Sequence, residues 1–118
     1  MAHPFERLEA WQLSHEQTLC LYQTTRAFPA EERFGLTGQL RRAAASVSAN
    51  IAEGSSCGTR RDFARYLSIA KKSSNEVAHW LILARDLGYL PRDQWRKLNN
   101  LNHRVGKVIW ALRKSLGE

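Results

Sequence analysis

Apolar positions recur at steps of three and four residues through most of the chain, which is the periodicity of amphipathic α-helices. The three prolines, Pro4, Pro29 and Pro91, lie at boundaries of this pattern, as do most of the seven glycines. These breaks divide the chain into four helical segments. No stretch alternates with a period of two for long enough to form a strand. The pattern therefore predicts a single all-α domain over residues 1–118.

The first helix is expected over about residues 5–26 and the second over about 36–55, with a turn at 30–35 between them. The apolar stripe of the first helix is expected to be Leu8, Trp11, His15, Thr18 or Leu19, and Tyr22. The stripe of the second is Leu36, Leu40, Ala44, Val47 and Ile51. The back of the second helix is small and nearly uncharged, which is typical of a helix buried on several sides: Arg41, Ala45, Ser48, Ala52 and Ser55. We expect another subunit to cover this back face.

A flexible connection is expected over residues 54–58, before the third helix begins at Thr59. Thr59 and Asp62 have the spacing of a capping box. The third helix then carries a strict heptad seam, made of Phe63, Leu67, Ala70, Ser74, Val77, Leu81 and Ala84. Gly88 is expected to end it.

The fourth helix is expected to begin at Pro91. Its seam is Trp95, Leu98, Asn102, Val105, Ile109, Leu112 and Leu116. Asn102 is the one polar member, and a lone polar residue in a seam often fixes the register of the helices. Short loops make consecutive helices antiparallel, so the predicted fold is an up-down-up-down four-helix bundle.

The formal net charge of +7 is unevenly distributed along the chain. Residues 1–58 carry five basic and six acidic groups, whereas residues 59–118 carry thirteen basic and five acidic groups. This asymmetry favours a polyanionic partner, although a basic surface can also serve solubility alone. No signal-peptide or membrane-spanning segment is evident, and we read Cys20 and Cys57 as reduced thiols of a cytoplasmic protein.

Several short runs are similar to a known family signature. In the second segment they are Phe34-Gly35-Leu36, Gln39-Leu40-Arg41-Arg42-Ala43, Ser46-Val47 and Asn50-Ile51-Ala52-Glu53-Gly54. In the third they are Asp62-Phe63, Tyr66-Leu67-Ser68-Ile69-Ala70, Ser73, Glu76 and Leu87-Gly88-Tyr89-Leu90. Over almost its entire length the chain resembles the four-helix-bundle family named for 23S rRNA intervening-sequence proteins. It departs from the family pattern at Lys72, where Gly is frequent, and at Thr59, where Ser is usual.

The resemblance implies a bundle that assembles as a ring-shaped homopentamer. It also implies kinship with the accessory protein of diversity-generating retroelements, a basic pentamer that works with a reverse transcriptase and nucleic acid. The resemblance therefore also implies a reverse transcriptase or another protein as a partner. The resemblance supports fold and assembly, and it bears on function only by analogy.

A polar stripe runs beside the apolar one on the second helix and continues on the third. Its members are Gln39, Ser46, Asn50, Glu53, Ser73 and Glu76. One interpretation is a small site with Glu53 and Glu76 as acid and base. The other, which we favour because no nucleophile is evident, is a hydrogen-bond network that fixes the packing of the helices.

The run from Glu76 to His79 matches the Glu-x-x-His spacing of di-iron bundles. Such sites need two of these motifs and further glutamates from two other helices. This chain has one motif, so we predict no metal site, no cofactor and no catalytic residues.

The fourth helix also has a basic row opposite its seam: Arg92, Arg96, His103, Lys107, Trp110 and Lys114. The third helix offers a second outward row, with Arg61, Arg65, Lys72 and His79. Basic side chains hold phosphates, and an exposed indole can stack on a base. Trp110 could instead anchor a subunit interface, or the row could simply be a solvated face.

These patterns predict a non-enzymatic cytoplasmic homo-oligomer that binds RNA or DNA through phosphates with low sequence specificity. The nucleic-acid contacts are expected at every member of the two rows except His79. The alternative is a structural scaffold whose basic face docks an acidic protein partner. No membrane partner is expected.

Overall fold

The computed structural model describes residues 2–117 and consists of four α-helices with two short 3₁₀ turns. The helices are α1 (Glu9–Thr25), α2 (Leu36–Ser55), α3 (Arg60–Asp86) and α4 (Arg92–Ser115). The 3₁₀ turns are η1 (Pro4–Arg7), before α1, and η2 (Ala30–Glu32), between α1 and α2. No strand occurs in this part of the chain, so the predicted all-α class is confirmed.

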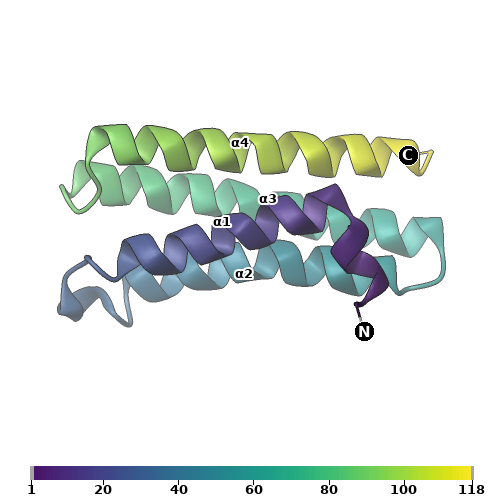
Figure 1. The fold of residues 1–118 in the computed structure, drawn as a ribbon, viewed down its shortest axis with the longest axis horizontal. Coiled ribbons are helices and arrows are strands. Elements are labelled where there is room, and N and C mark those ends of the chain that lie inside the picture. Colours follow the sequence, from purple (N-terminus) through teal and green to yellow (C-terminus); the bar gives the residue numbers. More distant parts are fainter. Residues whose placement is uncertain (1, 118) are drawn as a thin grey trace.

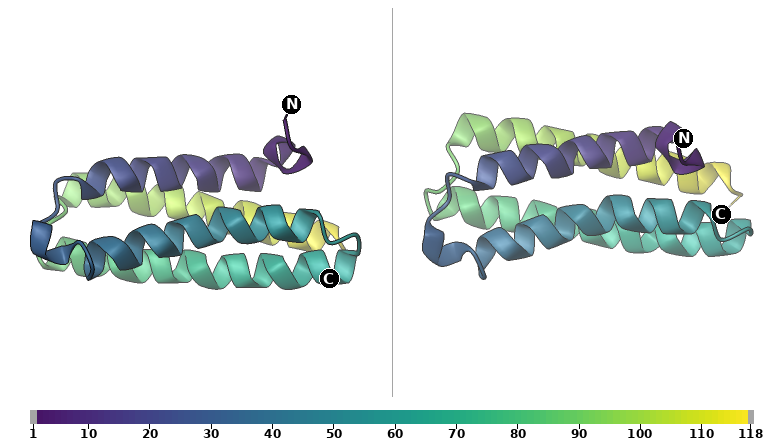
Figure 2. Two further views of the ribbon diagram at one scale, coloured as in Figure 1. Left: turned by 90° about the horizontal axis from the view of Figure 1, so that it is seen from below. Right: turned by 60° about the horizontal axis from the view of Figure 1, so that its bottom comes forward.

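Consecutive helices run antiparallel and form a four-helix bundle (Figure 1). α1 packs against α2 and α4, and α3 packs against the same two helices, so α1 and α3 are diagonal to each other. The turned views show this up-down-up-down order from two further sides (Figure 2). Short loops produce this order, because each loop is long enough only to reverse the chain into an adjacent, antiparallel helix.

The core consists of two hydrophobic clusters with a polar layer between them. One cluster lies toward the α1–α2 and α3–α4 loops and includes Leu21, Leu40 and Leu81. The other lies toward the opposite end and includes Val47 and Ile109. All five side chains are fully or almost fully buried.

The polar layer is centred on Asn102, the polar seam residue of α4. Its Oδ1 accepts hydrogen bonds from Gln17 Nε2 at 2.7 Å and from Ser74 Oγ at 3.2 Å. Its Nδ2 donates to the backbone carbonyl of Ser74 at 3.0 Å. The layer therefore joins α1, α3 and α4 at one level, as the prediction that Asn102 fixes register requires.

The helix ends follow from local signals. Thr59 Oγ1 accepts the backbone N–H of Asp62 at 3.1 Å and caps α3. The reciprocal half of the expected capping box does not form, so this cap is one-sided. Gly88 adopts φ +82° just beyond α3, a left-handed conformation that favours glycine, and Pro91 occupies the N-cap of α4.

At the loop end of the bundle, the Tyr89 hydroxyl donates to the Glu32 carboxylate at 3.0 Å. This bond ties η2 to the loop between α3 and α4. The neighbouring carboxylate, with partial burial, raises the pKa of Tyr89 above its usual range.

The predicted apolar stripe of α1 is wrong beyond its first two residues. Leu8 and Trp11 pack against the core as expected. The buried face combines two leucines with small and polar residues: Ala10, Leu13, Ser14, Gln17, Leu21 and Thr25. Leu19 and Tyr22 are exposed, and His15 lies on the surface with its ring stacked on Trp11. Two of the interior polar residues have partners on other helices: Gln17 Nε2 donates to Asn102 Oδ1 of α4, and Thr25 Oγ1 accepts from Arg41 of α2. Gln17 Oε1 is buried without a partner among the described residues.

Two expectations for α2 also need correction. Its small back face is not fully open in the single chain: Ser48 is buried, Ala45 and Ala52 are half-buried, and Arg41 bonds to Thr25 of α1 at 2.8 Å. Residues 54–58 are not all connection, because α2 continues to Ser55. The expected bounds of the second helix, 36–55, and its buried apolar stripe are confirmed.

Candidate nucleic-acid interface

The basic row of α4 lies on the outer surface of the bundle. Every member of the row is exposed: Arg92, Arg96, His103, Lys107, Trp110 and Lys114. Trp110 is 59% exposed, a large fraction for an indole. The row is solvent-facing because the opposite side of α4, including Val105 and Ile109, is buried in the core.

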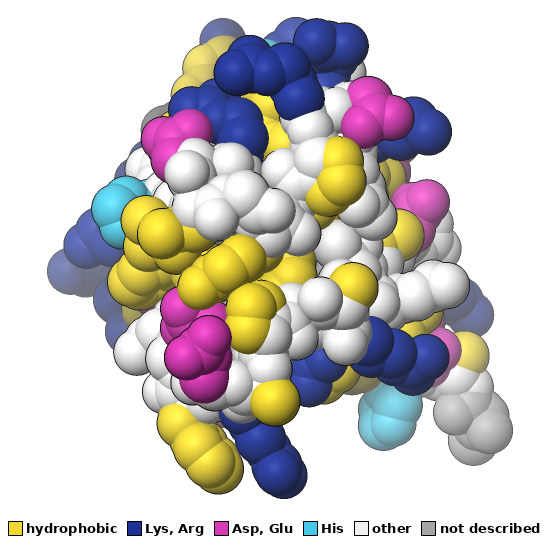
Figure 3. Space-filling view, turned by 90° about the vertical axis from the view of Figure 1, so that its left-hand side faces the viewer, with side chains coloured by type: hydrophobic (Ala, Val, Ile, Leu, Met, Phe, Trp, Pro, Cys, Tyr) yellow, Lys and Arg dark blue, Asp and Glu magenta, His cyan; other side chains and the backbone are white. Residues whose placement is uncertain are grey.

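The charge of this surface is nearly uncompensated. α4 carries seven Lys and Arg residues and one acidic residue, Asp93, whereas α1 carries two glutamates and no Lys or Arg. Within residues 2–117, the single ion pair closer than 4.0 Å joins Arg85 to Asp86 at the end of α3. In this part of the chain the cations of α4 therefore have no carboxylate partners. Seen from the loop end, Lys and Arg side chains gather at the top, where α4 lies (Figure 3).

The outward row of α3 runs alongside α4. Arg61, Arg65, Lys72 and His79 are all exposed. Antiparallel packing sets Ser74 against Asn102, and this register carries Arg61 and Arg65 toward the Lys114 end of α4. The two predicted rows thus form one continuous basic surface over α3 and α4, which we call the basic surface.

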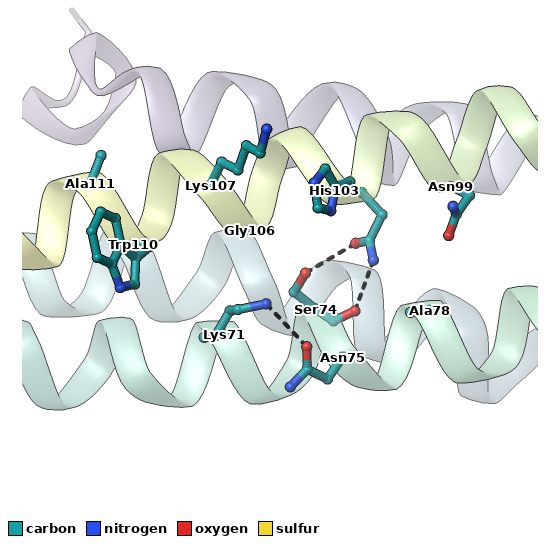
Figure 4. A pocket seen from close by; sticks show the side chains of 11 residues that line it. Lys71, Ser74, Asn75, Ala78, Asn99, His103, Gly106, Lys107, Trp110 and Ala111 are labelled. Atoms are coloured by element: carbon teal, nitrogen blue, oxygen red, sulfur yellow. Dashed lines mark hydrogen bonds between the residues drawn. The ribbon is translucent and has the colours of Figure 1, made fainter.

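A groove of about 670 Å³ runs between α3 and α4 within the basic surface. Its lining includes Lys71 and Asn75 from α3 and Asn99, His103 and Trp110 from α4. Only His103 and Trp110 of these five belong to the predicted rows. Figure 4 shows Trp110 projecting from α4 toward Lys71 on α3. Sequence reasoning missed Lys71, Asn75 and Asn99 as candidate site residues. The available signal was Gly106, an unexplained glycine in the middle of α4.

The predicted polar network on α2 and α3 forms only in part. Ser46 Oγ and Ser73 Oγ are 2.9 Å apart, and Asn50 Nδ2 donates to the Ser46 carbonyl at 2.8 Å. Gln39 makes no side-chain hydrogen bond to these residues, and the other two members lie outside the network.

Those two outer members, Glu53 and Glu76, are both exposed. The Glu76 carboxylate accepts instead from Trp80 Nε1 at 3.1 Å on the same helix. Because Ser46 lies opposite Ser73, Glu53 and Glu76 are separated by about ten residues along the bundle axis, or about 15 Å. This separation is too large for the acid–base pair considered from the sequence.

The described residues contain no group of three or more His, Cys, Asp or Glu side chains that could hold a metal ion. His79, the histidine of the Glu-x-x-His motif, packs edge-on against Trp80 at the surface. Cys20 and Cys57 are free and half-buried. Among the helices of residues 2–117, none is long and apolar enough to cross a membrane.

Comparison with known proteins gives a consistent match. A family model described as "23S rRNA-intervening sequence protein" matches residues 6–111. The chain is also similar to the crystal structure of a protein of unknown function from the S23 ribosomal protein family of Bacteroides thetaiotaomicron, with 28% identity and a TM-score of 0.82. That similarity covers 89% of this chain and 98% of the other. No curated protein matches the chain.

Proposed function

This chain belongs to the 23S rRNA-intervening sequence protein family, and on that premise we propose that it is a non-enzymatic oligomer that binds RNA or DNA. The observation that carries the proposal is the basic surface, where the exposed cations of α4 have no carboxylate partners within residues 2–117. Cations in this state release condensed counterions from a nucleic acid when they meet its phosphates. The contact is with the backbone, so sequence specificity is low.

Charge reversal of Lys107 and Lys114 tests this proposal. Both residues are exposed, so the Lys107→Glu, Lys114→Glu variant keeps the fold. We expect the variant to bind mixed RNA and DNA about tenfold more weakly at low salt. We also expect the plot of log binding constant against log salt concentration to be shallower by about one unit for each phosphate contact that the variant loses. Binding constants measured over a series of salt concentrations give both quantities.

A matched control is Arg7→Glu with Arg26→Glu, because both arginines are exposed and lie outside the basic surface. This control changes the net charge by the same amount as the Lys107→Glu, Lys114→Glu variant. If both variants weaken nucleic-acid binding equally, overall charge and not the basic surface accounts for the binding. If the unaltered protein binds neither RNA nor DNA at low salt, the proposal fails. Retention of an acidic protein, with no nuclease-sensitive material, would favour the scaffold function instead.

We propose in addition that the chain forms a homo-oligomer, and that the family resemblance makes a ring of five the expected size. A second heptad stripe on α3 supports assembly, since one seam suffices for the bundle itself. The stripe lies on the flank of α3 that faces α2, and its members are half-buried or exposed: Tyr66, Ile69, Ser73, Glu76, Trp80, Leu83 and Leu87. Phe34, which is 86% exposed, lies at the same end of the bundle as Leu83 and Leu87.

Kinship with the accessory protein of diversity-generating retroelements remains a proposal that rests on the motifs of α2 and α3. It would make a reverse transcriptase a partner of the oligomer. The gene neighbourhood tests this relationship, because such a partner is expected to be encoded beside this chain.

A further inference from the structure

The groove between α3 and α4 has a shape that phosphate binding alone does not need. Its volume of about 670 Å³ lies in the range of ligand pockets. From Asn99 to Trp110 it follows α4 for eleven residues, a length of about 16 Å. A flat row of lysines would hold a phosphate backbone equally well, so the hollow requires its own explanation.

Gly106 keeps this groove open. A β-carbon at this position would lie 3.1 Å from Lys71 Nζ and 3.9 Å from Ser74 Oγ. Glycine inside a helix costs up to about 1 kcal/mol relative to alanine. In α4 this residue lies buried at the floor of the groove, beneath the end of the Lys71 side chain and one helical turn before Trp110.

Trp110 forms one wall of the groove and presents an open ring. The Lys114 ammonium lies 4.8 Å from the centre of the indole, over one face. No aromatic ring among residues 2–117 stacks on Trp110, and its side chain is 59% exposed, so we expect the other face to accept a planar ligand. A cation on one side of an indole is compatible with stacking of a base on the other.

The remaining lining combines polar side chains with Ala78 and Ala111 and carries no acidic residue. Asn99 makes no side-chain hydrogen bond within the described residues, so its amide can both donate and accept. Lys71 donates to Asn75 Oδ1 at 3.1 Å, which leaves the Asn75 amide N–H groups and further Lys71 donors free. Amides recognise the edges of bases, and ammonium groups recognise phosphates.

We infer that this groove holds unpaired bases of a single-stranded nucleic acid, an inference that rests on the proposed function and names its substrate class. One base stacks on Trp110, neighbouring bases lie along the groove toward Asn99, and Lys71 and Lys114 hold the phosphates beside them. At a stacked spacing of about 3.4 Å, the groove accommodates up to about five bases. A duplex cannot use it, because its bases are already stacked on each other and paired.

The test compares a short oligoadenylate RNA with an RNA duplex of the same length, at one low salt concentration. We expect Trp110→Ala to weaken binding of the oligoadenylate about tenfold and to change duplex binding by less than about twofold. Trp110→Phe retains a stacking ring and should keep most of the single-strand affinity. Fluorescence anisotropy of labelled nucleic acids measures each dissociation constant.

A second variant, Gly106→Leu, obstructs the groove while it keeps Trp110 and removes no charged residue, although the end of the Lys71 side chain must move aside. It should show the same selective loss. Tyr22→Ala is the matched control: Tyr22 is an exposed aromatic residue with the Arg41 guanidinium over its ring at 4.6 Å, on the α1–α2 side of the bundle. This control should leave both dissociation constants unchanged. Circular dichroism verifies that each variant is folded.

The outcomes separate this inference from the function on which it rests. If the unaltered protein binds neither nucleic acid, the proposed function fails and the inference fails with it. If it binds both, and Trp110→Ala and Gly106→Leu weaken neither or weaken both equally, the proposed function stands and the inference is overturned. The inference is also overturned if adenosine monophosphate binds as tightly as the oligoadenylate, or if Trp110→Ala reduces only the mass of the oligomer.

Discussion

At the scale of single residues, Gly54 and Gly106 show how differently two buried helical glycines can act. A β-carbon on Gly54 would lie 2.6 Å from Tyr66 Cβ and 3.0 Å from Phe63 Cδ1, both parts of the packed face of α3. A β-carbon on Gly106 meets only the end of the flexible Lys71 side chain within 3.4 Å. Gly54 therefore allows α2 and α3 to approach closely, whereas Gly106 shapes a surface.

The two glycines predict opposite changes in the free energy of unfolding. Gly54→Ala should lower it by about 1–3 kcal/mol, because the new methyl group overlaps a packed helix. Gly106→Ala should raise it by up to about 1 kcal/mol, because alanine favours the helix and Lys71 can move aside. Urea denaturation at one fixed protein concentration measures both changes. Equal stability of the Gly54→Ala variant and the unaltered protein would contradict a close approach at this position.

At the scale of the helices, the polar layer around Asn102 fixes how α1, α3 and α4 are aligned. A shift of one helix by a turn would move Asn102 away from Gln17 and Ser74 and leave buried polar groups without partners. Each unsatisfied buried group costs about 1–3 kcal/mol. The two hydrophobic clusters on either side would tolerate such a shift better, because apolar contacts are not directional.

Asn102→Ala should therefore destabilise the bundle more than the smaller side-chain volume would suggest. The substitution leaves Gln17 and Ser74 buried without a shared acceptor, so we expect a loss of about 1–3 kcal/mol in the free energy of unfolding. Asn100→Ala, two residues earlier on the exposed side of α4, is the control and should stay within about 0.5 kcal/mol. Equal effects of the two substitutions in chemical denaturation would argue against a register-fixing role.

At the scale of the whole molecule, charge and apolar surface meet on the outer face of α3. Ile69, Glu76 and Leu83 of the second heptad stripe each lie four residues after a member of the outward row of α3, whereas the basic row of α4 lies across the groove. An oligomer built on the stripe would therefore leave the basic row of α4 free on each subunit. Repeated around an assembly, these rows would add to a larger positive field and raise the rate of encounter with a polyanion.

The assembly proposal predicts that Leu83→Glu with Leu87→Glu produces a monomer. Leu83 is 37% and Leu87 is 49% exposed in the single chain, so the changes should not unfold it. Carboxylates within a subunit interface would be buried without partners, which is costly. Light scattering during size-exclusion chromatography compares the variant with the 13.5 kDa expected for one chain.

Leu19→Glu is the matched control for this experiment, because Leu19 is an exposed leucine on α1. The Leu19→Glu variant should have the same mass in solution as the unaltered protein. The family resemblance leads us to expect the mass of a pentamer for both. An unaltered protein that is already monomeric at all concentrations would refute assembly and would leave nucleic-acid binding to be judged separately.

The sequence by itself determined the four helices, the helix ends at Thr59, Gly88 and Pro91, and three of the four buried stripes. Thr59, Gly88 and Pro91 act through contacts within a few residues, and the heptad seams of α3 and α4 depend only on helical periodicity. The exposure of the basic row on α4 follows from the same periodicity, since it lies opposite a seam. Local chemistry and one repeat length are sufficient for all of these features.

The tertiary structure decided which side of α1 is buried, which polar residues pair and where a groove lies. Gln17 is interior because its partner, Asn102, is 85 residues away, and Glu53 is separated from Glu76 by the register of α2 against α3. The groove likewise needs Lys71 and Gly106 to be adjacent across two helices. These features depend on how far each helix is shifted along its neighbour, a quantity set by the packing of all four helices and not by the periodicity of any one.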